Sequence, residues 1–357
     1  MEKKRDVLIS RDIKKTFSSI LAIIVALILT GIFIWLIGFN PIEAYSVLME
    51  GALKGKSALS ETVVNAIPLI FSSLGFAVAY QCGIFNIGAG GQLYMGAVFA
   101  TFVGTMKGMS PSIQLPLTLL AGILGGALWG LAVAVLKIKF GANEMITTIM
   151  FNYIANIFAS YCVAGPMKGS SAMGLAQSDP VMSGIRLARF IQGTRLHTGL
   201  FIALLLIIGY WILMWHTSKG YELRVMGLNP AAAQYCGITV NRNIVFTLML
   251  AGGIAGLGGC IEILAIQGKL SAGFAGNIGF DGITVALLGD CTPIGILLSS
   301  LLFGALSSGS NKMQMIVGVP CAATEIIQAF IIITIITRNV FHVDLNKILS
   351  HKEAEHR

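Results

Sequence analysis

The stretch that decides the fold runs from Gly83 to Gly96 and reads Gly-Ile-Phe-Asn-Ile-Gly-Ala-Gly-Gly-Gln-Leu-Tyr-Met-Gly. Apolar runs of membrane-spanning length come before and after it. Backbone exposed to lipid must stay helical, because no water is present to satisfy its N–H and C=O groups. Irregular, glycine-rich backbone at membrane depth is expected only where protein or a water-filled cavity shields it. We therefore expect this segment to lie at or near a transport pathway.

The composition is that of a membrane protein. Of the 357 residues, 55% are hydrophobic and 11% are charged, whereas roughly a quarter of a soluble domain is charged. The net charge of +8 sits mostly in predicted loops and tails, which suits membrane orientation and anionic headgroups rather than nucleic acid. The six cysteines form no Cys-x-x-Cys pair and no zinc spacing, so we expect no metal site.

The hydropathy pattern predicts an all-α, polytopic membrane protein with about ten transmembrane helices in a single domain, residues 16–337. The predicted spans are 17–39, 61–81, 88–105, 113–136, 144–164, 199–215, 243–266, 279–289, 293–309 and 321–337. Pro293 is placed to start a helix rather than continue one, which favours ten spans over nine. The basic tail 1–15 and the polar tail 338–357 are expected in the cytoplasm. A short amphipathic helix is expected outside, around Pro41 to Leu53.

A short internal repeat accompanies the glycine-rich segment. Asn86-Ile-Gly-Ala-Gly-Gly91 recurs as Asn277-Ile-Gly-Phe-Asp-Gly282, and both copies precede an apolar helix. In the predicted topology the two copies leave spans that run in opposite directions, so spans 2–5 and 7–10 would form inverted halves. Inverted repeats with broken helices at matching positions indicate a transporter whose site lies at the repeat interface.

Residues 216–242 form the predicted cytoplasmic loop between spans 6 and 7. Within it, Asn229 can cap a helix, Pro230 suits the first helical position, and Gly237 can end the helix. Two interpretations remain open for this short helix. It is either a linker that rests on the headgroups or a docking surface for a cytoplasmic partner.

Four amides in or beside spans are candidates for the pathway: Asn86, Gln92, Asn143 and Asn152. Amides both donate and accept hydrogen bonds, which suits a neutral polar solute. The alternative is that they join helices, each contributing about 0.6 kcal/mol.

Two acidic residues, Glu262 and Asp281, lie inside or at the edge of apolar runs. A charge at the bilayer centre costs about 2.5–3.5 kcal/mol on insertion scales, so such residues usually face a cavity or a partner. We count both among the candidate pathway residues, although Asp281 is near a span end and can simply reach water.

Three motifs carry a resemblance to a known family: Phe85-Asn-Ile-Gly-Ala-Gly-Gly-Gln92, the run from Gly141 to Ile154, and the run from Gly220 to Gly237. The C-terminal run from Gly279 to Leu306 fits as well. The sequence resembles the permease subunits of ATP-driven ABC importers for nucleosides, ribose-type sugars and branched-chain amino acids. It resembles the nucleoside branch best, with one departure at Gly90, where that branch usually shows Glu.

This resemblance implies a prokaryotic plasma-membrane importer with a second, homologous permease, ABC ATPase subunits that bind ATP and Mg, and an extracellular substrate-binding lipoprotein. It also implies that the 229–237 helix couples the chain to the ATPase. The residues expected at that contact are Arg224, Gly227, Asn229, Pro230, Ala231 and Ala232.

The expected function is therefore that of a nucleoside permease. The alternatives are a permease for ribose-type sugars or branched-chain amino acids and, less favoured, an ion-coupled secondary transporter. The sequence contains no phosphate-binding loop and none of the common hydrolase or metalloprotease motifs, so we do not expect an enzyme.

Overall fold

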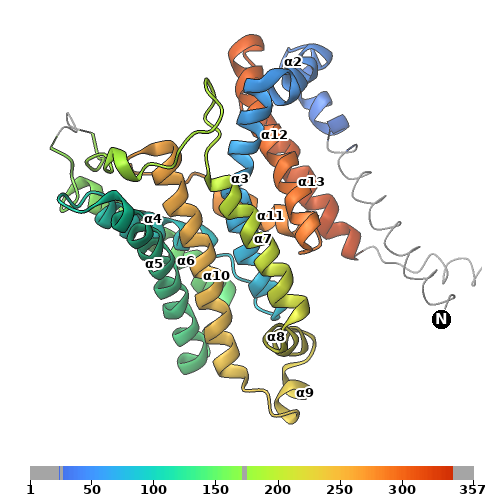
Figure 1. Ribbon diagram of the computed structural model, residues 1–357. Coiled ribbons are helices and arrows are strands. Elements are labelled where there is room, and N and C mark those ends of the chain that lie inside the picture. Colours follow the sequence, from blue (N-terminus) through green and yellow to red (C-terminus); the bar gives the residue numbers. More distant parts are fainter. Residues whose placement is uncertain (1–23, 25–26, 171–174, 341–357) are drawn as a thin grey trace, which may run out of the picture. The chain divides into compact units, whose positions relative to one another are not determined.

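The computed structural model describes residues 24, 27–170 and 175–340, and the regular elements in that part of the chain are helices (Figure 1). The predicted tail 1–15 and residues 341–357 of the other tail lie outside the described residues. The helices after the first apolar one, Leu27–Leu36, are α2 (Pro41–Leu53), α3 (Gly55–Gln81), α4 (Ala89–Gly104), α5 (Pro111–Phe140), α6 (Glu144–Ala164), η1 (Ser183–Ile185), α7 (Gly199–His216), α8 (Ser218–Leu228), α9 (Pro230–Tyr235), α10 (Val240–Glu262), η2 (Ile263–Gln267), α11 (Ile278–Leu288), α12 (Pro293–Val317) and α13 (Ala322–Val340).

The helices confirm the class of a polytopic, all-α membrane protein. Among the described residues, six helices are long and apolar enough to cross a membrane: α3, α5, α6, α7, α10 with η2, and α12. Shorter helices occupy other predicted span positions, among them α4 and α11. The count of ten crossings and the inverted repeat stay predictions.

Local signals set several helix ends where the sequence predicts them. The side chain of Asn143 caps α6, because its Oδ1 accepts hydrogen bonds from the N–H groups of Met145 at 2.9 Å and Ile146 at 3.4 Å. A cap of this kind satisfies N–H groups that have no partner inside the helix. The predicted and observed bounds of this helix therefore agree.

The break between α11 and α12 is also present. The two residues Asp290 and Cys291 have φ angles of 50° and 52°, which a continuous helix does not allow. Pro293 then begins α12. Predicted spans 8 and 9 are thus separate helices.

Residues 52–308 form one compact unit, in which α10 packs against α3, α4 and α5. Glycines make the contact with α5 a close one. A Cβ atom added to Gly126 would overlap the carbonyl oxygen of Gly252 and lie 2.8 Å from the Cα of Gly256. The glycines Gly122, Gly126 and Gly130, spaced four residues apart on one face of α5, therefore allow backbone-to-backbone packing, as small residues do in membrane helices.

The described residues before 52 and after 308 form a second unit. Here the Tyr45 hydroxyl donates a hydrogen bond of 2.5 Å to the carbonyl of Leu27. The side chains of Ser310 and Thr324 hydrogen-bond at 2.8 Å. These contacts join the N-terminal helices to each other and α12 to α13.

Candidate functional site

The glycine-rich segment forms an irregular corner, residues 82–88, between α3 and α4. The N–H groups of Gly83 and Ile84 donate to the carbonyls of Tyr80 and Ala79, each at 3.0 Å. Gly83 has a φ of 76°, in the left-handed region that glycine adopts without steric cost. The chain can therefore leave α3 abruptly and begin a new helix.

Two side chains of α6 satisfy the backbone of this corner. Asn152 donates from Nδ2 to the carbonyl of Ile87 at 2.9 Å and accepts at Oδ1 from the N–H of Gly91 at 2.7 Å. Thr148, one turn earlier, accepts from the N–H of Ile87 at 3.3 Å. These side chains supply the partners that lipid cannot, which explains how irregular backbone is tolerated here.

Asn86 and Gln92 are buried inside the same corner. Asn86 Oδ1 accepts from the N–H of Gly88 at 2.9 Å, and its Nδ2 donates to Gln92 Oε1 at 3.4 Å. Within the described part of the chain, the buried Nε2 of Gln92 has no hydrogen-bond partner. Three of the four predicted amides thus gather at the corner, and one of them keeps an unused donor.

The second Asn-Ile-Gly copy meets the first. A Cβ atom on Gly279, in the first turn of α11, would lie 2.5 Å from both the Cα and the nitrogen of Gly90 in α4. Ser72 of α3 donates to the carbonyl of Gly279 at 3.4 Å. Asp281 is half-buried in the same first turn of α11. Two helix N-termini, each with a positive partial charge, therefore adjoin beside α3.

The corner also touches α8, which belongs to the predicted cytoplasmic loop. A Cβ atom on Gly83 would lie 3.1 Å from the Cα of Gly227, and one on Gly227 would lie 3.1 Å from the nitrogen of Gly83. Thr247 of α10 donates to the Cys82 sulfur at 3.3 Å. The backbones of α8 and the corner are in direct contact, and only glycine fits on either side.

The short helix predicted after Asn229 is present as α9. Asn229 Oδ1 accepts from the N–H groups of Ala231 at 3.0 Å and Ala232 at 3.1 Å, and Pro230 takes the first helical position. Gly237, with a φ of 80°, follows the helix end. The preceding helix α8 is an addition, because no helix is expected there from the sequence.

The α9 surface carries large exposed side chains. Leu228, just before α9, is 88% exposed, and Tyr235 at its end is 94% exposed. Ala231 and Ala232 between them are exposed as well. Arg224 on α8 is half-buried, and its Nε has no partner among the described residues. An exposed, partly apolar surface is therefore available to another molecule.

Glu262 lies away from the corner, at the other end of α10. It is 15 residues beyond Thr247, or about 22 Å along a helix axis. It is buried, and its Oε1 accepts from Gln267 Nε2 at 3.2 Å across the π-helix η2. π-Helical turns occur often at functional sites. Asn143, nine residues before Asn152, is likewise separate and exposed.

The long loop before α7 covers this end of α10 through backbone hydrogen bonds. Val181 donates to the carbonyl of Gly268 at 2.9 Å, and Ser178 donates to that of Leu270 at 2.8 Å. Arg195 binds Glu61 through two hydrogen bonds, of 2.9 and 2.5 Å. These bonds raise the pKa of Arg195, and the negative charges of Glu61 and Glu262 add to the effect.

His197 is buried at the same loop, and its Nδ1 accepts from the N–H of Gly199 at 3.2 Å. Burial, together with the nearby positive charge of Arg189, lowers the pKa of His197 to about 4. The imidazole is therefore neutral at pH 7. In the described residues no group of three or more His, Cys, Asp or Glu side chains could hold a metal ion.

Two residues that the sequence did not point to contact the corner or the start of α11 from other helices. Thr148 and Ser72 bond to the two helix starts. The spacing of Thr148, four residues before Asn152, is a signal that could have found it, because such residues share a helix face. No local pattern points to Ser72.

The buried corner between broken helices, within a bundle of long apolar helices, defines a polytopic membrane protein of the transport class. The chain belongs to the family described as branched-chain amino acid transport system / permease component, whose family model matches residues 58–336. It is a permease subunit of an ABC transporter and not an enzyme, because the members of this family are transport components.

Curated relatives extend over nearly the whole chain. The guanosine ABC transporter permease protein NupP of Bacillus subtilis is 34% identical over 94% of this chain and 98% of its own. The glucose ABC transporter permease protein TsgB13 of Haloferax volcanii is 33% identical over 90% and 87%. The nucleoside ABC transporter permease protein NupB of Lactococcus lactis is 31% identical over 96% of both chains. No solved structure matches the chain.

Proposed function

We propose that the chain forms the translocation pathway of a nucleoside importer. The observation that carries this proposal is the similarity to NupP and NupB, which extends over almost the full length of all three chains. A sugar is the second candidate, because TsgB13, named for glucose, is about as similar. Branched-chain amino acids and ion-coupled transport have less support.

The corner supports a neutral, polar solute. The unused Nε2 donor of Gln92 is buried beside Asn86, and an amide N–H suits a carbonyl or hydroxyl group of a passing solute. Asn152 of α6 bonds to the start of α4, and Asp281 lies in the first turn of α11, which meets it. We assign these four residues to the pathway at this corner. We assign Glu262 to its opposite end, and Asn143 to the end near α6's start.

The ATPase would act through α9. In this proposal, ABC ATPase subunits bind ATP and Mg at the cytoplasmic face and dock on the exposed residues Ala231, Ala232 and Tyr235. The force would pass through α8 to Gly227, which touches Gly83 in the corner. A movement of α9 would therefore reach the pathway by backbone contact, without any flexible side chain between.

The relatives also support a second permease subunit as a partner. Bacillus subtilis has two proteins named as guanosine permeases, NupP and NupQ, and both are similar to this chain. We therefore propose a second permease as the partner in a heterodimer, and an extracellular lipoprotein that delivers substrate. Both termini would lie in the cytoplasm, with the chain in the plasma membrane of a prokaryotic cell.

The substrate is tested by uptake in cells that express the chain with its partners. Labelled guanosine should accumulate, and excess unlabelled nucleoside should block it while excess glucose does not. Disabling the phosphate loop of the partner ATPase should abolish uptake. Uptake that survives this change and follows an ion gradient would favour a secondary transporter, and competition by glucose alone would favour the sugar.

Docking is tested by Ala232→Arg, which adds a long cation to the exposed face of α9. We expect uptake to be lost while the amount of chain in the membrane is unchanged. Lys139→Glu is the control, because this exposed residue also changes charge but lies at the end of α5. Normal ATP-dependent uptake by Ala232→Arg would remove α9 from the docking surface.

A further inference from the structure

An apolar groove lies between α5, α7 and α10. It has a volume of about 380 Å³ and no charged or amide side chain in its lining. The lining residues are Ile123 of α5, Leu206 of α7, and Phe246, Met249, Leu250, Gly253, Ile254 and Leu257 of α10. A hollow of this size on a membrane helix bundle is not left empty, because an unfilled gap forfeits van der Waals contacts along its walls.

The length of the groove fits one leaflet of a bilayer. From Phe246 to Leu257 the α10 axis rises about 16 Å at 1.5 Å per residue. The hydrocarbon core of a bilayer is about 30 Å thick, so half of it is about 15 Å. The groove thus runs from near one membrane surface to near the midplane, as the acyl chain of a lipid in that leaflet does.

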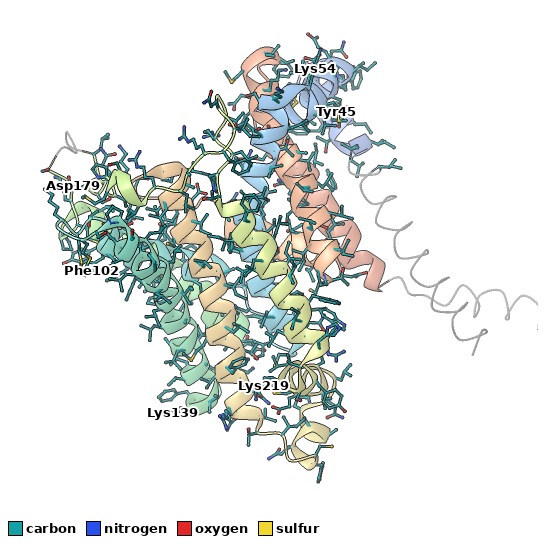
Figure 2. The ribbon with its side chains drawn as sticks, in the orientation of Figure 1. Tyr45, Lys54, Phe102, Lys139, Asp179 and Lys219 are labelled. Carbon is teal, nitrogen blue, oxygen red and sulfur yellow. The ribbon has the colours of Figure 1, made fainter. Side chains whose placement is uncertain are left out.

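Positive charge lies at one end of the groove. The Lys219 ammonium of α8 is 5.8 Å from the centroid of the Phe246 ring, and Figure 2 labels Lys219 beside the end of α10 that adjoins α8. Arg242, exposed in the first turn of α10, precedes Phe246 by four residues and so shares its helix face.

One carboxylate accompanies these two cations. Glu222 accepts from Lys219 at 2.8 Å and from Asn243 at 3.2 Å. These hydrogen bonds, and the nearby charges of Lys219 and Arg242, lower the pKa of Glu222, so it is ionised at pH 7. Two cations and one anion leave a net positive charge at the end of an apolar groove.

We propose that this groove is a binding site for an anionic phospholipid, with an acyl chain along α10 and the phosphate headgroup at Lys219 and Arg242. The lipid would come from the leaflet on the α8 side, which is the cytoplasmic leaflet in the proposed orientation. The apolar length selects a hydrocarbon chain, and the charge selects an acidic headgroup. The site lies beside α8, so a bound lipid would restrict the movement of the loop that contains α8 and α9.

A transmembrane helix from another chain fits less well. A helix is about 10 Å across, so a 16 Å length of it occupies roughly 1,200 Å³. The groove offers about a third of that space. A single hydrocarbon chain matches this volume better, and an apolar helix would leave the net positive charge of Lys219, Arg242 and Glu222 unbalanced.

The test is a lipid titration of the full-length chain, purified in detergent and followed by native mass spectrometry. The probes are phosphatidylglycerol, which is anionic, and phosphatidylcholine, which carries no net charge. We expect one phosphatidylglycerol to bind more tightly than phosphatidylcholine. In Lys219→Gln/Arg242→Gln the affinity for phosphatidylglycerol should fall about 30-fold, which is roughly fivefold for each cation near a membrane surface.

Two further variants separate headgroup from chain. Gly253→Leu should weaken both lipids, because a side chain at Gly253 points toward Ile123, whose Cγ2 would lie 3.2 Å from an added Cβ. Lys139→Gln is the matched control, since it removes a cation at the end of α5 that does not line the groove. It should leave the phosphatidylglycerol affinity unchanged.

Equal binding of the two lipids by the unaltered chain would overturn the proposal. So would an effect of Lys139→Gln as large as that of the double variant, or cross-linking of another chain's helix to the groove. The proposal rests on the proposed function only for the choice of leaflet. The assay measures lipid and not uptake, so its failure is distinct from a failure of nucleoside transport.

Discussion

Replacing Gly227 with alanine tests whether α8 and the corner move together. An added Cβ would overlap the carbonyl oxygen of Gln81 and lie 3.0 Å from its carbonyl carbon. It would also lie 3.1 Å from the nitrogen of Gly83. All three are backbone atoms, which cannot rotate away as the end of a side chain can. The close contact of α8 with the corner must therefore loosen.

The size of the effect follows from the cost of overpacking. Forcing an extra methyl group into a closely packed contact costs about 1–3 kcal/mol. Alanine also raises the intrinsic helix stability relative to glycine, but α8 is helical whether or not it touches the corner, so this gain cancels. A penalty of about 1–3 kcal/mol lowers the equilibrium ratio of the coupled to the uncoupled arrangement about 5–150-fold.

The assay is substrate uptake per molecule of chain in the membrane, measured with the partner subunits present. We expect uptake by Gly227→Ala to fall by up to about 150-fold, while the ATPase still turns over without substrate transport. The matched control is Gly209→Ala in α7, because an added Cβ there meets no atom within 4 Å. That variant should transport normally.

One result would refute the reasoning about Gly227. If Gly227→Ala and Gly209→Ala take up substrate equally at equal abundance, the contact between α8 and the corner does not transmit force. Loss of abundance is scored separately, because uptake is divided by the amount of inserted chain.

Three further predictions concern stability, measured as the Tm of the purified chain. Asn152→Ala should lower the Tm, because two backbone groups of the corner lose their hydrogen-bond partners, at a cost of about 1–3 kcal/mol each. Asn143→Ala should lower the stability only by the value of the α6 cap, about 0.5–2 kcal/mol. Equal losses in the two variants would contradict the bridging role of Asn152. Gly126→Val should destabilise the folded chain by about 1–3 kcal/mol, because the added side chain overlaps Gly252. Gly209→Val, the control, should leave the Tm unchanged. An unchanged Tm in Gly126→Val would mean that α5 and α10 pack less closely than the structure shows. His197 has a folded pKa of about 4, below its usual 6.5. As the pH falls, His197 therefore takes up its proton at a higher pH in the unfolded chain than in the folded chain. Stability is full above pH 6.5 and falls toward pH 4 by of order 3 kcal/mol, and His197→Gln should flatten this decline.

The helix ends that sequence predicts well are those set by neighbouring residues. Asn143 caps α6, Asn229 caps α9 and Pro293 starts α12. Each of these signals involves residues that are close together in the chain, so it can be recognised from the sequence. Other bounds differ from prediction, among them the start of α3 at Gly55 instead of residue 61. Helix α8 lies in what is predicted as loop, and α12 continues to Val317, beyond the predicted end at residue 309.

The candidate pathway residues could also be predicted only in part from the sequence. The amides Asn86, Gln92 and Asn152 are visible as polar residues in apolar runs, and the structure brings them to one corner. It also occupies much of their hydrogen-bonding capacity with backbone groups. Their pathway role stays a prediction, with the unused Nε2 of Gln92 as its best support.

The sequence by itself determined that this protein is a membrane protein, where several of its helices begin or end, and that the helix before Gly83 is interrupted there. These properties depend on hydropathy and on short-range capping, both of which act between near neighbours. Only the tertiary structure decided that Asn152 satisfies the broken backbone, that Gly90 meets Gly279, and that Gly227 lies against Gly83. Such contacts join residues far apart in the chain, and they depend on how whole helices pack, which no local pattern records.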